Sequence, residues 1–347
     1  MTCSSQNTAN RSEDVAPASR LKTDTLAASV ALLLAATLIQ RSVGFGRGIL
    51  FCRWLSPEAL GQWEMAYSFL LLAAPLAVLG VPGSFGRYAE HFRQRGHLRT
   101  FLERAALWTA ACAAAAVAII AWLAPTFSTL LFGSGEHVPL IWGIALVLAS
   151  VVFHHTLTAL LVSLRMYRIV SAMNLAHSLL FAATALTALL WQPGVAAIVF
   201  GYGLASFLSG CGALAWSWPG LRSLEPPPER LPHGDFWPKL LRFAFFVWLT
   251  NLLSHLFAIV DRYMILHFSG MNAETALEQV GHYHSSRIVP LLFVSFADLL
   301  AGLVMPHWTD DWEAGRRQDV GRRVNAALKA TGIGMAGVGV AVLLASP

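Results

Sequence analysis

Three arginines interrupt an apolar stretch near the start of the chain. Arg41, Arg47 and Arg53 lie within residues 40–65, which read QRSVGFGRGILFCRWLSPEALGQWEM. An arginine in hydrocarbon at the centre of a spanning helix costs roughly 2.5–3.5 kcal/mol, so such side chains usually face water, a partner helix or an anionic ligand. We therefore expect this helix to line a substrate path through a membrane rather than to face lipid.

The spacing of these arginines decides which of them can share a cavity. Arg41 and Arg47 are six residues apart, a rotation of about 600° on a regular helix, so a straight helix would point them in different directions. Three glycines within residues 44–48 favour a bend or a close helix contact. We predict that Arg41 faces the cavity and that Arg47 does so through the bend, with snorkelling to the outer interface as the alternative for Arg47. Arg53 is expected to reach that interface.

A polar stripe follows in the seventh apolar segment. Trp248, Asn251, His255 and Arg262 fall on one helical face at spacings of three, four and seven, with Asp261 beside them. An aromatic side chain combined with hydrogen-bonding groups fits a wall that faces a sugar or a lipid headgroup. We therefore include Asn251, His255, Asp261 and Arg262 among the predicted binding residues.

The eighth segment carries a second set of ionisable residues. His284, Arg287 and Asp298 share a face, because 11 and 14 residues are close to whole numbers of turns. His284 and Arg287 join the predicted binding residues. The alternative to a binding role is that these charged residues form structural ion pairs. Asp261 would then pair with Arg262 or with Arg41, and Asp298 would pair with Arg287. A paired carboxylate can also titrate and couple transport to protons.

The histidines and cysteines offer no clear metal site. His154 and His155 are adjacent and point to different faces, so we expect them and His177 to make packing or hydrogen-bond contacts instead. The four cysteines are too scattered for a metal-binding spacing: they are Cys3, Cys52, Cys112 and Cys211. We predict no metal, no cofactor and no catalytic residue.

The elements that must position these residues are transmembrane helices. Hydrophobic residues make up 56% of the 347 residues and charged residues 12%, and the mean hydropathy is +0.57. Long apolar runs of this kind predict an all-α polytopic membrane protein, since helices satisfy their own backbone hydrogen bonds in lipid. In such a protein, we interpret the net charge of +5 as a signal for orientation in the membrane and for binding anionic partners, not for binding nucleic acid.

Hydropathy predicts about nine spans, the first of them a retained helix rather than a cleaved signal peptide. The expected spans are 23–52, 62–82, 101–124, 138–163, 169–191, 194–216, 241–266, 281–305 and 324–346. They predict a disordered N-terminus at 1–22, a six-helix lobe at 23–216, a linker at 217–240 and a partial second lobe at 241–347.

Basic residues concentrate in alternate loops. They are Arg87, Arg93, Arg95 and Arg99, then Arg165 and Arg168, then Arg222, Arg230 and Lys239, and finally Arg316, Arg317, Arg322 and Arg323. The loops between them, such as 126–137 and 192–194, contain no Lys or Arg. The positive-inside rule therefore places the N-terminus and the basic loops in the cytoplasm.

The chain also contains a diffuse internal repeat. Gly61-Gln62-Trp63 and Gly281-His282-Tyr283 each begin a helix after an acidic loop, at an offset of 281 − 61 = 220 residues. With six spans between them, the two units start on the same side of the membrane. This predicts a parallel repeat about an axis along the membrane normal, in which Arg41 corresponds to Asp261.

Four segments together resemble a known family: 53–61 (RWLSPEALG), 76–88 (LAVLGVPGSFGRY), 261–270 (DRYMILHFSG) and 279–293 (QVGHYHSSRIVPLLF). In order and spacing they are similar to the polysaccharide biosynthesis flippases, the Wzx-type O-antigen flippases of the multidrug/oligosaccharidyl-lipid/polysaccharide exporter superfamily. The resemblance implies two six-helix lobes around a central cavity, which open alternately and move a polyprenyl-diphosphate-linked oligosaccharide outward across the bacterial inner membrane.

The resemblance also implies roles for residues and partners. Arg41 and Arg47 would recognise the diphosphate, since the planar fork of arginine donors suits phosphate. Arg87 and Tyr88 match a family position and would gate or anchor the inner mouth. The implied partners are the lipid-linked oligosaccharide, membrane lipids and a coupling ion, H+ or Na+. Because the family usually has twelve or more helices, we expect the chain ending at Pro347 to be truncated at its C-terminus.

Two other functions fit the same composition. A cation-coupled drug exporter of the superfamily would favour acidic cavity residues, whereas the buried charges here lean basic. A membrane enzyme of polysaccharide assembly, such as a polymerase or acyltransferase, would more often carry a large outward loop, and the expected outward loops are short. No phosphate-binding glycine loop of an ATPase occurs in the sequence. We therefore predict a transporter and not an enzyme.

Overall fold

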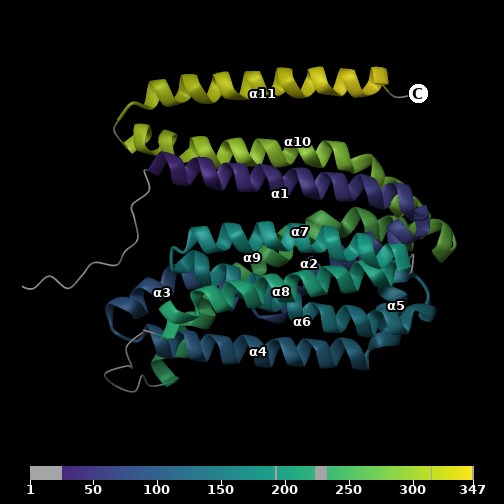
Figure 1. The fold of residues 1–347 in the computed structure, drawn as a ribbon, viewed down its shortest axis with the longest axis horizontal. Coiled ribbons are helices and arrows are strands. Elements are labelled where there is room, and N and C mark those ends of the chain that lie inside the picture. The colour runs from purple at the N-terminus through teal and green to yellow at the C-terminus, as the bar shows by residue number, and fades with distance from the viewer. Residues whose placement is uncertain (1–25, 192–193, 223–232, 314, 346–347) are drawn as a thin grey trace, which may run out of the picture.

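The computed structural model describes residues 26–191, 194–222, 233–313 and 315–345, and within these ranges every long element is a helix (Figure 1). The elements are α1 (Leu26–Trp54), α2 (Pro57–Ala77), η1 (Val81–Ser84), α3 (Phe85–Gln94), α4 (Leu98–Trp122), α5 (Ala124–Phe132), η2 (Gly135–His137), α6 (Val138–Ser163), α7 (Tyr167–Trp191), α8 (Val195–Arg222), α9 (His233–Phe268), α10 (Ala273–Glu313) and α11 (Arg317–Ala345). The long helices run side by side along one direction (Figure 1).

The expected fold class is confirmed, because a long helix covers most of each predicted span. Six helices of the described chain are long and apolar enough to cross a membrane, and seven if the bent pair of α2 with η1 and α3 counts as one span. The protein is therefore an all-α polytopic membrane protein.

The second span differs from the expected continuous helix at 62–82. It begins earlier, because the Ser56 hydroxyl accepts a hydrogen bond from the Ala59 N–H and Pro57 occupies the first turn. It ends at Ala77, and the chain turns by 62° into η1 and α3. Gly80 at φ 71° occupies the turn, a left-handed conformation that suits glycine.

Other boundaries also shift. The expected outward loop at 126–137 contains most of α5 and all of η2. Within the expected linker 217–240, helix α8 continues to Arg222 and α9 begins at His233, while 223–232 lies outside the described residues. The N-terminal segment 1–22 also lies outside them.

The core forms where α6 and α8 pack against α2 and α7. Its fully buried side chains include Leu70, Ile141, Ile144, Leu148 and Ile198. Large apolar side chains on the outer helices remain exposed, as the surface of a lipid-embedded bundle requires; examples are Trp122, Leu190, Trp191, Phe207 and Phe257.

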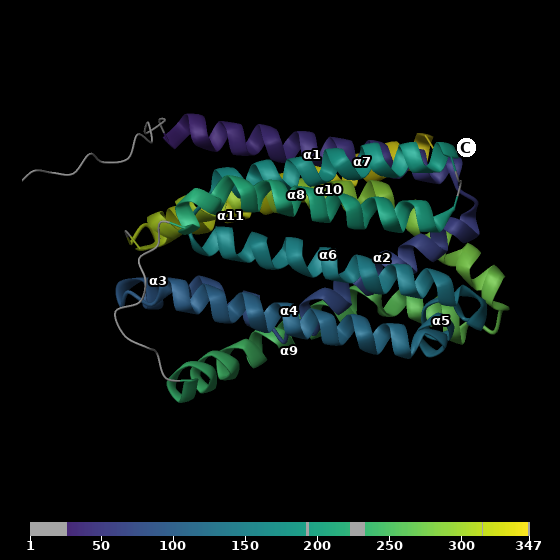
Figure 2. The same ribbon diagram turned by 60° about the horizontal axis from the view of Figure 1, so that its bottom comes forward.

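The ends of the bundle separate the loops into two groups. Helix α3 and the α10–α11 turn, which carry basic residues, lie at one end in both views, and α5 and the α9–α10 turn lie at the other (Figures 1 and 2). This arrangement agrees with the expected alternation of basic and uncharged loops. Which end faces the cytoplasm stays a prediction.

Helices α2 and α10 touch through the two glycines of the repeat. A Cβ on Gly61 would lie 1.9 Å from the Leu277 carbonyl oxygen, and a Cβ on Gly281 would lie 1.9 Å from that of Pro57. Both pairs obey the predicted offset, because 277 − 57 and 281 − 61 equal 220. Equivalent residues thus make reciprocal contacts, as expected when a pseudo-twofold axis passes between two helices.

Candidate functional site

A cavity of about 370 Å³ lies between α1, α2, α7, α8 and α10. We call it the arginine cavity, since Arg41 and Arg47 line it. Its other lining residues are mostly aromatic or polar: Gln40, Phe45, Phe51, Trp63, Glu64, Tyr67, His177, Ser178, Phe181, Tyr202, His284 and Ser295, with Gly44, Gly48, Ile288, Leu291 and Leu292. The two predicted cavity arginines therefore share one site.

Arg47 lies against an aromatic wall. Its guanidinium carbon is 4.0 Å from the centroid of the Phe181 ring, a cation–π geometry. Trp63 stacks on Tyr67, and Tyr202 meets Tyr67 edge to face. Such rings hold a cation while leaving its N–H donors available for an anion.

Arg41 is exposed and donates a hydrogen bond from Nη1 to the Ser295 hydroxyl of α10 at 2.8 Å. Among the described residues, neither Arg41 nor Arg47 has a carboxylate within 4.0 Å. Arg53 lies in the last turn of α1, is exposed and is not among the residues that line the cavity. Its expected place at the outer interface stays a prediction. The cavity thus contains two cations without an acidic partner.

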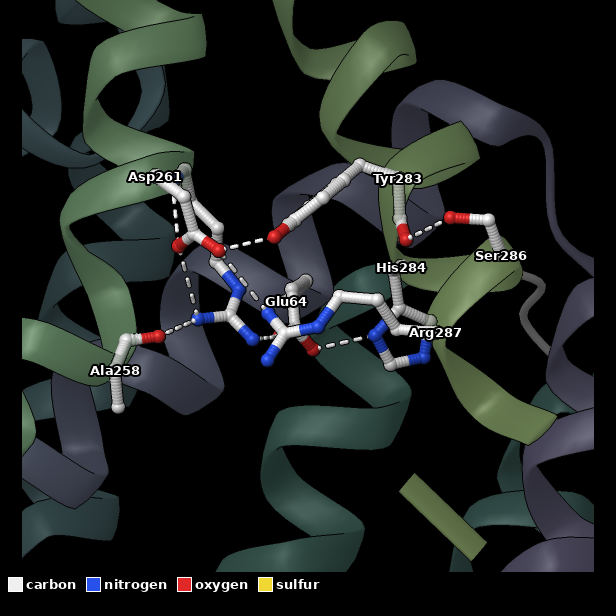
Figure 3. A network of polar contacts seen from close by, with 8 residues as sticks. Glu64, Ala258, Asp261, Tyr283, His284, Ser286 and Arg287 are labelled. Carbon is white, nitrogen blue, oxygen red and sulfur yellow. Dashed lines mark hydrogen bonds and ion pairs between the residues drawn. The ribbon is translucent and has the colours of Figure 1, made fainter. Parts of the chain in front are cut away.

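A buried ion-pair network borders this cavity (Figure 3). Glu64 of α2, 4% exposed, contacts Arg262 Nη2 of α9 at 2.5 Å and His284 Nδ1 of α10 at 2.6 Å. Since 284 − 64 is also 220, Glu64 and His284 are equivalent positions of the predicted repeat, and their side chains are in contact. The only carboxylate among the lining residues is therefore already neutralised.

Asp261 continues the network toward α10. It lies 3.6 Å from Arg262 Nη1 and 3.3 Å from Arg287 Nη1, and it accepts a hydrogen bond from the Tyr283 hydroxyl (Figure 3). Asp261 therefore forms the structural ion pair with Arg262 that the sequence offered as an alternative to ligand binding. Arg287 is an additional partner that was not expected. The expected partner of Arg287, Asp298, has a side chain outside the described residues.

Asn251 and His255 lie in a different place from the arginines. With His155 and Thr156 of α6 they line a second cavity of about 240 Å³, which we call the histidine cavity. Its remaining lining residues are apolar side chains or glycine: Leu71, Ala74, Pro75, Val78, Gly80, Pro82, Gly83 and Val152. The predicted binding residues are thus divided among two cavities and the network.

Arg87 and Tyr88 attach α3 to α9. The Arg87 guanidinium carbon lies 5.0 Å from the centroid of the Phe243 ring, and Tyr88 meets the same ring edge to face at 6.0 Å. These contacts hold α3 against α9, and the expected role of Arg87 and Tyr88 as a gate or anchor of the inner mouth stays a prediction.

The histidines of α6 and α7 make hydrogen bonds, as the sequence predicts. His154 pairs with Ser209 and His177 with Ser206, each at 3.1 Å, and the two rings lie 4.7 Å apart. Within the described ranges no group of three or more potential ligands is placed to hold a metal ion.

Sequence reasoning missed Glu64. Two signals point to it: it is an acidic residue within the apolar run of α2, and the 220-residue offset pairs it with His284. Glu64 directly follows Trp63, and His284 directly follows Tyr283, so the predicted repeat already places the two residues at equivalent positions.

These features define a polytopic α-helical membrane protein with a cationic cavity between its helices. The chain belongs to the polysaccharide biosynthesis protein family, whose model matches residues 26–297, more than half of the chain. Comparison with curated proteins gives no match, and comparison with solved structures gives none. Family membership agrees with the resemblance seen in the sequence and supports a role in polysaccharide biosynthesis.

Proposed function

We propose that the protein is a flippase that moves a polyprenyl-diphosphate-linked oligosaccharide across the bacterial inner membrane by alternating access, with its N-terminus in the cytoplasm. The observation that carries this proposal is the pair of cavity arginines, Arg41 and Arg47, without a carboxylate partner among the described residues. Cations within a membrane are costly unless water or an anion compensates them, and a diphosphate offers two phosphates to two guanidinium groups.

The acidic residue of the cavity does not favour the drug-exporter alternative. Glu64 is paired with Arg262 and His284 and is not free to bind a cationic drug. A coupling ion, H+ or Na+, remains part of the proposal, as does the absence of enzymatic activity.

The proposal is tested by complementation of a flippase-deficient strain with the complete reading frame. We expect Arg41→Ala and Arg47→Ala to lower glycan export roughly 10- to 100-fold at equal expression, the loss expected for charge-assisted hydrogen bonds. Arg41→Lys should retain partial export, because lysine keeps the charge but not the fork of donors.

Arg53→Ala is the matched control. It removes an arginine from the same helix, but Arg53 is exposed and is not among the cavity-lining residues, so export should stay near the wild-type level. Full export by Arg41→Ala and Arg47→Ala would refute the proposed function of the cavity.

A further inference from the structure

The histidine cavity contains four polar side chains from two helices that face one another. His155 and Thr156 come from α6, and Asn251 and His255 come from α9. Helix α9 follows the expected linker, so the cavity lies between the first group of helices and the second. It is therefore placed where two lobes would meet.

Most of these polar side chains have no hydrogen-bond partner in the part of the chain that the structure describes. The His255 Nδ1 lies 2.8 Å from the backbone oxygen of Asn251 and donates to it, which leaves Nε2 as an acceptor. Within the described residues, no hydrogen bond is made by the side chains of Asn251, Thr156 or His155. His155 is exposed, and Thr156, Asn251 and His255 are half-buried. The cavity therefore presents open donors and acceptors with which a ligand can form hydrogen bonds.

The chemistry of the cavity indicates an uncharged ligand. None of its lining residues, all of them in the described part of the chain, is Asp, Glu, Lys or Arg. Amide, hydroxyl and imidazole groups supply both donors and acceptors, as does a sugar hydroxyl. An anion would find no charge to compensate it here, whereas the arginine cavity offers two.

One face of α2 connects the two cavities. Glu64 and Tyr67 line the arginine cavity, and Leu71, Ala74 and Val78 line the histidine cavity. These five positions are separated by three or four residues in turn, so they lie along one face of α2, which ends in the C-cap residue Val78. Tyr67 and Leu71 are one turn apart, about 6 Å along the axis. The cavities therefore follow one another along a single surface.

We propose that the histidine cavity is a subsite for the uncharged sugar that adjoins the diphosphate, with Asn251 and His255 as its hydrogen-bonding groups. This inference rests on the proposed function and extends it, because it assigns the anionic and the neutral parts of one substrate to separate cavities. Asn251 and His255 then determine specificity for the glycan, while Arg41 and Arg47 bind any polyprenyl diphosphate.

Binding to the purified full chain in lipid nanodiscs tests this division with two probes. One probe is bare polyprenyl diphosphate, and the other is the lipid-linked oligosaccharide extracted from the strain used for complementation. Asn251→Ala and His255→Ala should weaken binding of the glycosylated probe roughly 3- to 10-fold and change binding of the bare probe by less than about twofold.

Thr250→Ala is the control on the same helix. Thr250 is exposed, bonds to the Phe246 carbonyl and is not among the cavity-lining residues, so binding of both probes should be unchanged. Equal weakening of both probes by Asn251→Ala, or no weakening of either, overturns the sugar subsite. Asn251→Ser provides a second variant should Asn251→Ala not purify as a folded protein. Arg41→Ala tests the proposed function separately, because it must weaken both probes.

Discussion

Glu64 is buried between Arg262 and His284, and these neighbours determine what its removal would do. Its carboxylate compensates Arg262, which is 8% exposed and has an Nε without a partner among the described residues. Removing one member of a buried ion pair leaves the other charge in a low-dielectric environment, which costs more than the pair itself contributes.

We therefore predict that Glu64→Ala destabilises the protein by roughly 3–5 kcal/mol. The measurement is the thermal unfolding midpoint of the purified protein in detergent. Glu103→Ala is the control, since Glu103 pairs with Arg99 at 2.9 Å on the exposed surface of α4 and its loss should cost less than about 1 kcal/mol. The double variant Glu64→Leu, Arg262→Leu should recover most of the lost stability. Equal midpoints for Glu64→Ala and Glu103→Ala would contradict this account.

The sequence predicted individual side chains unevenly. Arg41 and Arg47 could be placed in a cavity because the cost of a cation in lipid is large and local. The pairing of Asp261 with Arg262 and Arg287 could not be decided, because it depends on how α9 and α10 approach each other. The position of Asn251 was limited in the same way. The sequence predicted the helical face on which it lies, but not that this face lines a cavity separate from that of the arginines.

The contact between α2 and α10 depends on the absence of two side chains. Gly61 and Gly281 each face a backbone carbonyl oxygen of the other helix, and a Cβ at either position would lie 1.9 Å from it. A backbone atom cannot rotate away as a side chain does, so the helices must separate to admit a methyl group. Because the contacts are reciprocal, the two positions should be equally sensitive.

We expect Gly61→Ala and Gly281→Ala to destabilise the protein by similar amounts, roughly 1–3 kcal/mol or more. Thermal unfolding midpoints measure the effect. Gly46→Ala in α1 is the control, because a Cβ there meets no atom within 4 Å and alanine favours the helix. A large loss for one glycine and none for the other would show that the reciprocal contact is not formed.

Helices were predicted more reliably than their breaks. Hydropathy located α6 at 138–163 because a long apolar run can be satisfied in lipid only by a helix. It did not predict the 62° turn after α2, since that turn depends on how Gly80 packs against α9. Hydropathy does not predict α5 as a separate helix, because its nine residues are too few to span a membrane.

Alternating access requires the helices before the linker to move relative to those after it. In the described structure these groups are joined by the α2–α10 contact, the Glu64 network and the contact of Arg41 with Ser295. A further contact joins Cys52 of α1 to Ser285 of α10, with Sγ and Oγ 3.5 Å apart. Each of these contacts includes a residue of α10, and α9 also meets α2 through Arg262 and α3 through Phe243. Because Arg41 of α1 and His284 of α10 both line the arginine cavity, movement of α10 away from α1 would open it.

The natural Cys52 permits a test of this motion with one substitution. Ser285→Cys brings a second thiol close to Cys52, near enough for a disulfide after a small adjustment. We expect mild oxidation to form this disulfide, detected by mass spectrometry of the linked peptides, and to abolish glycan export in the complemented strain. A reductant should restore export, because the bond only prevents α1 and α10 from separating. With Cys52→Ala added, oxidation should have no effect, and undiminished export by the cross-linked protein would show that these helices stay together throughout transport.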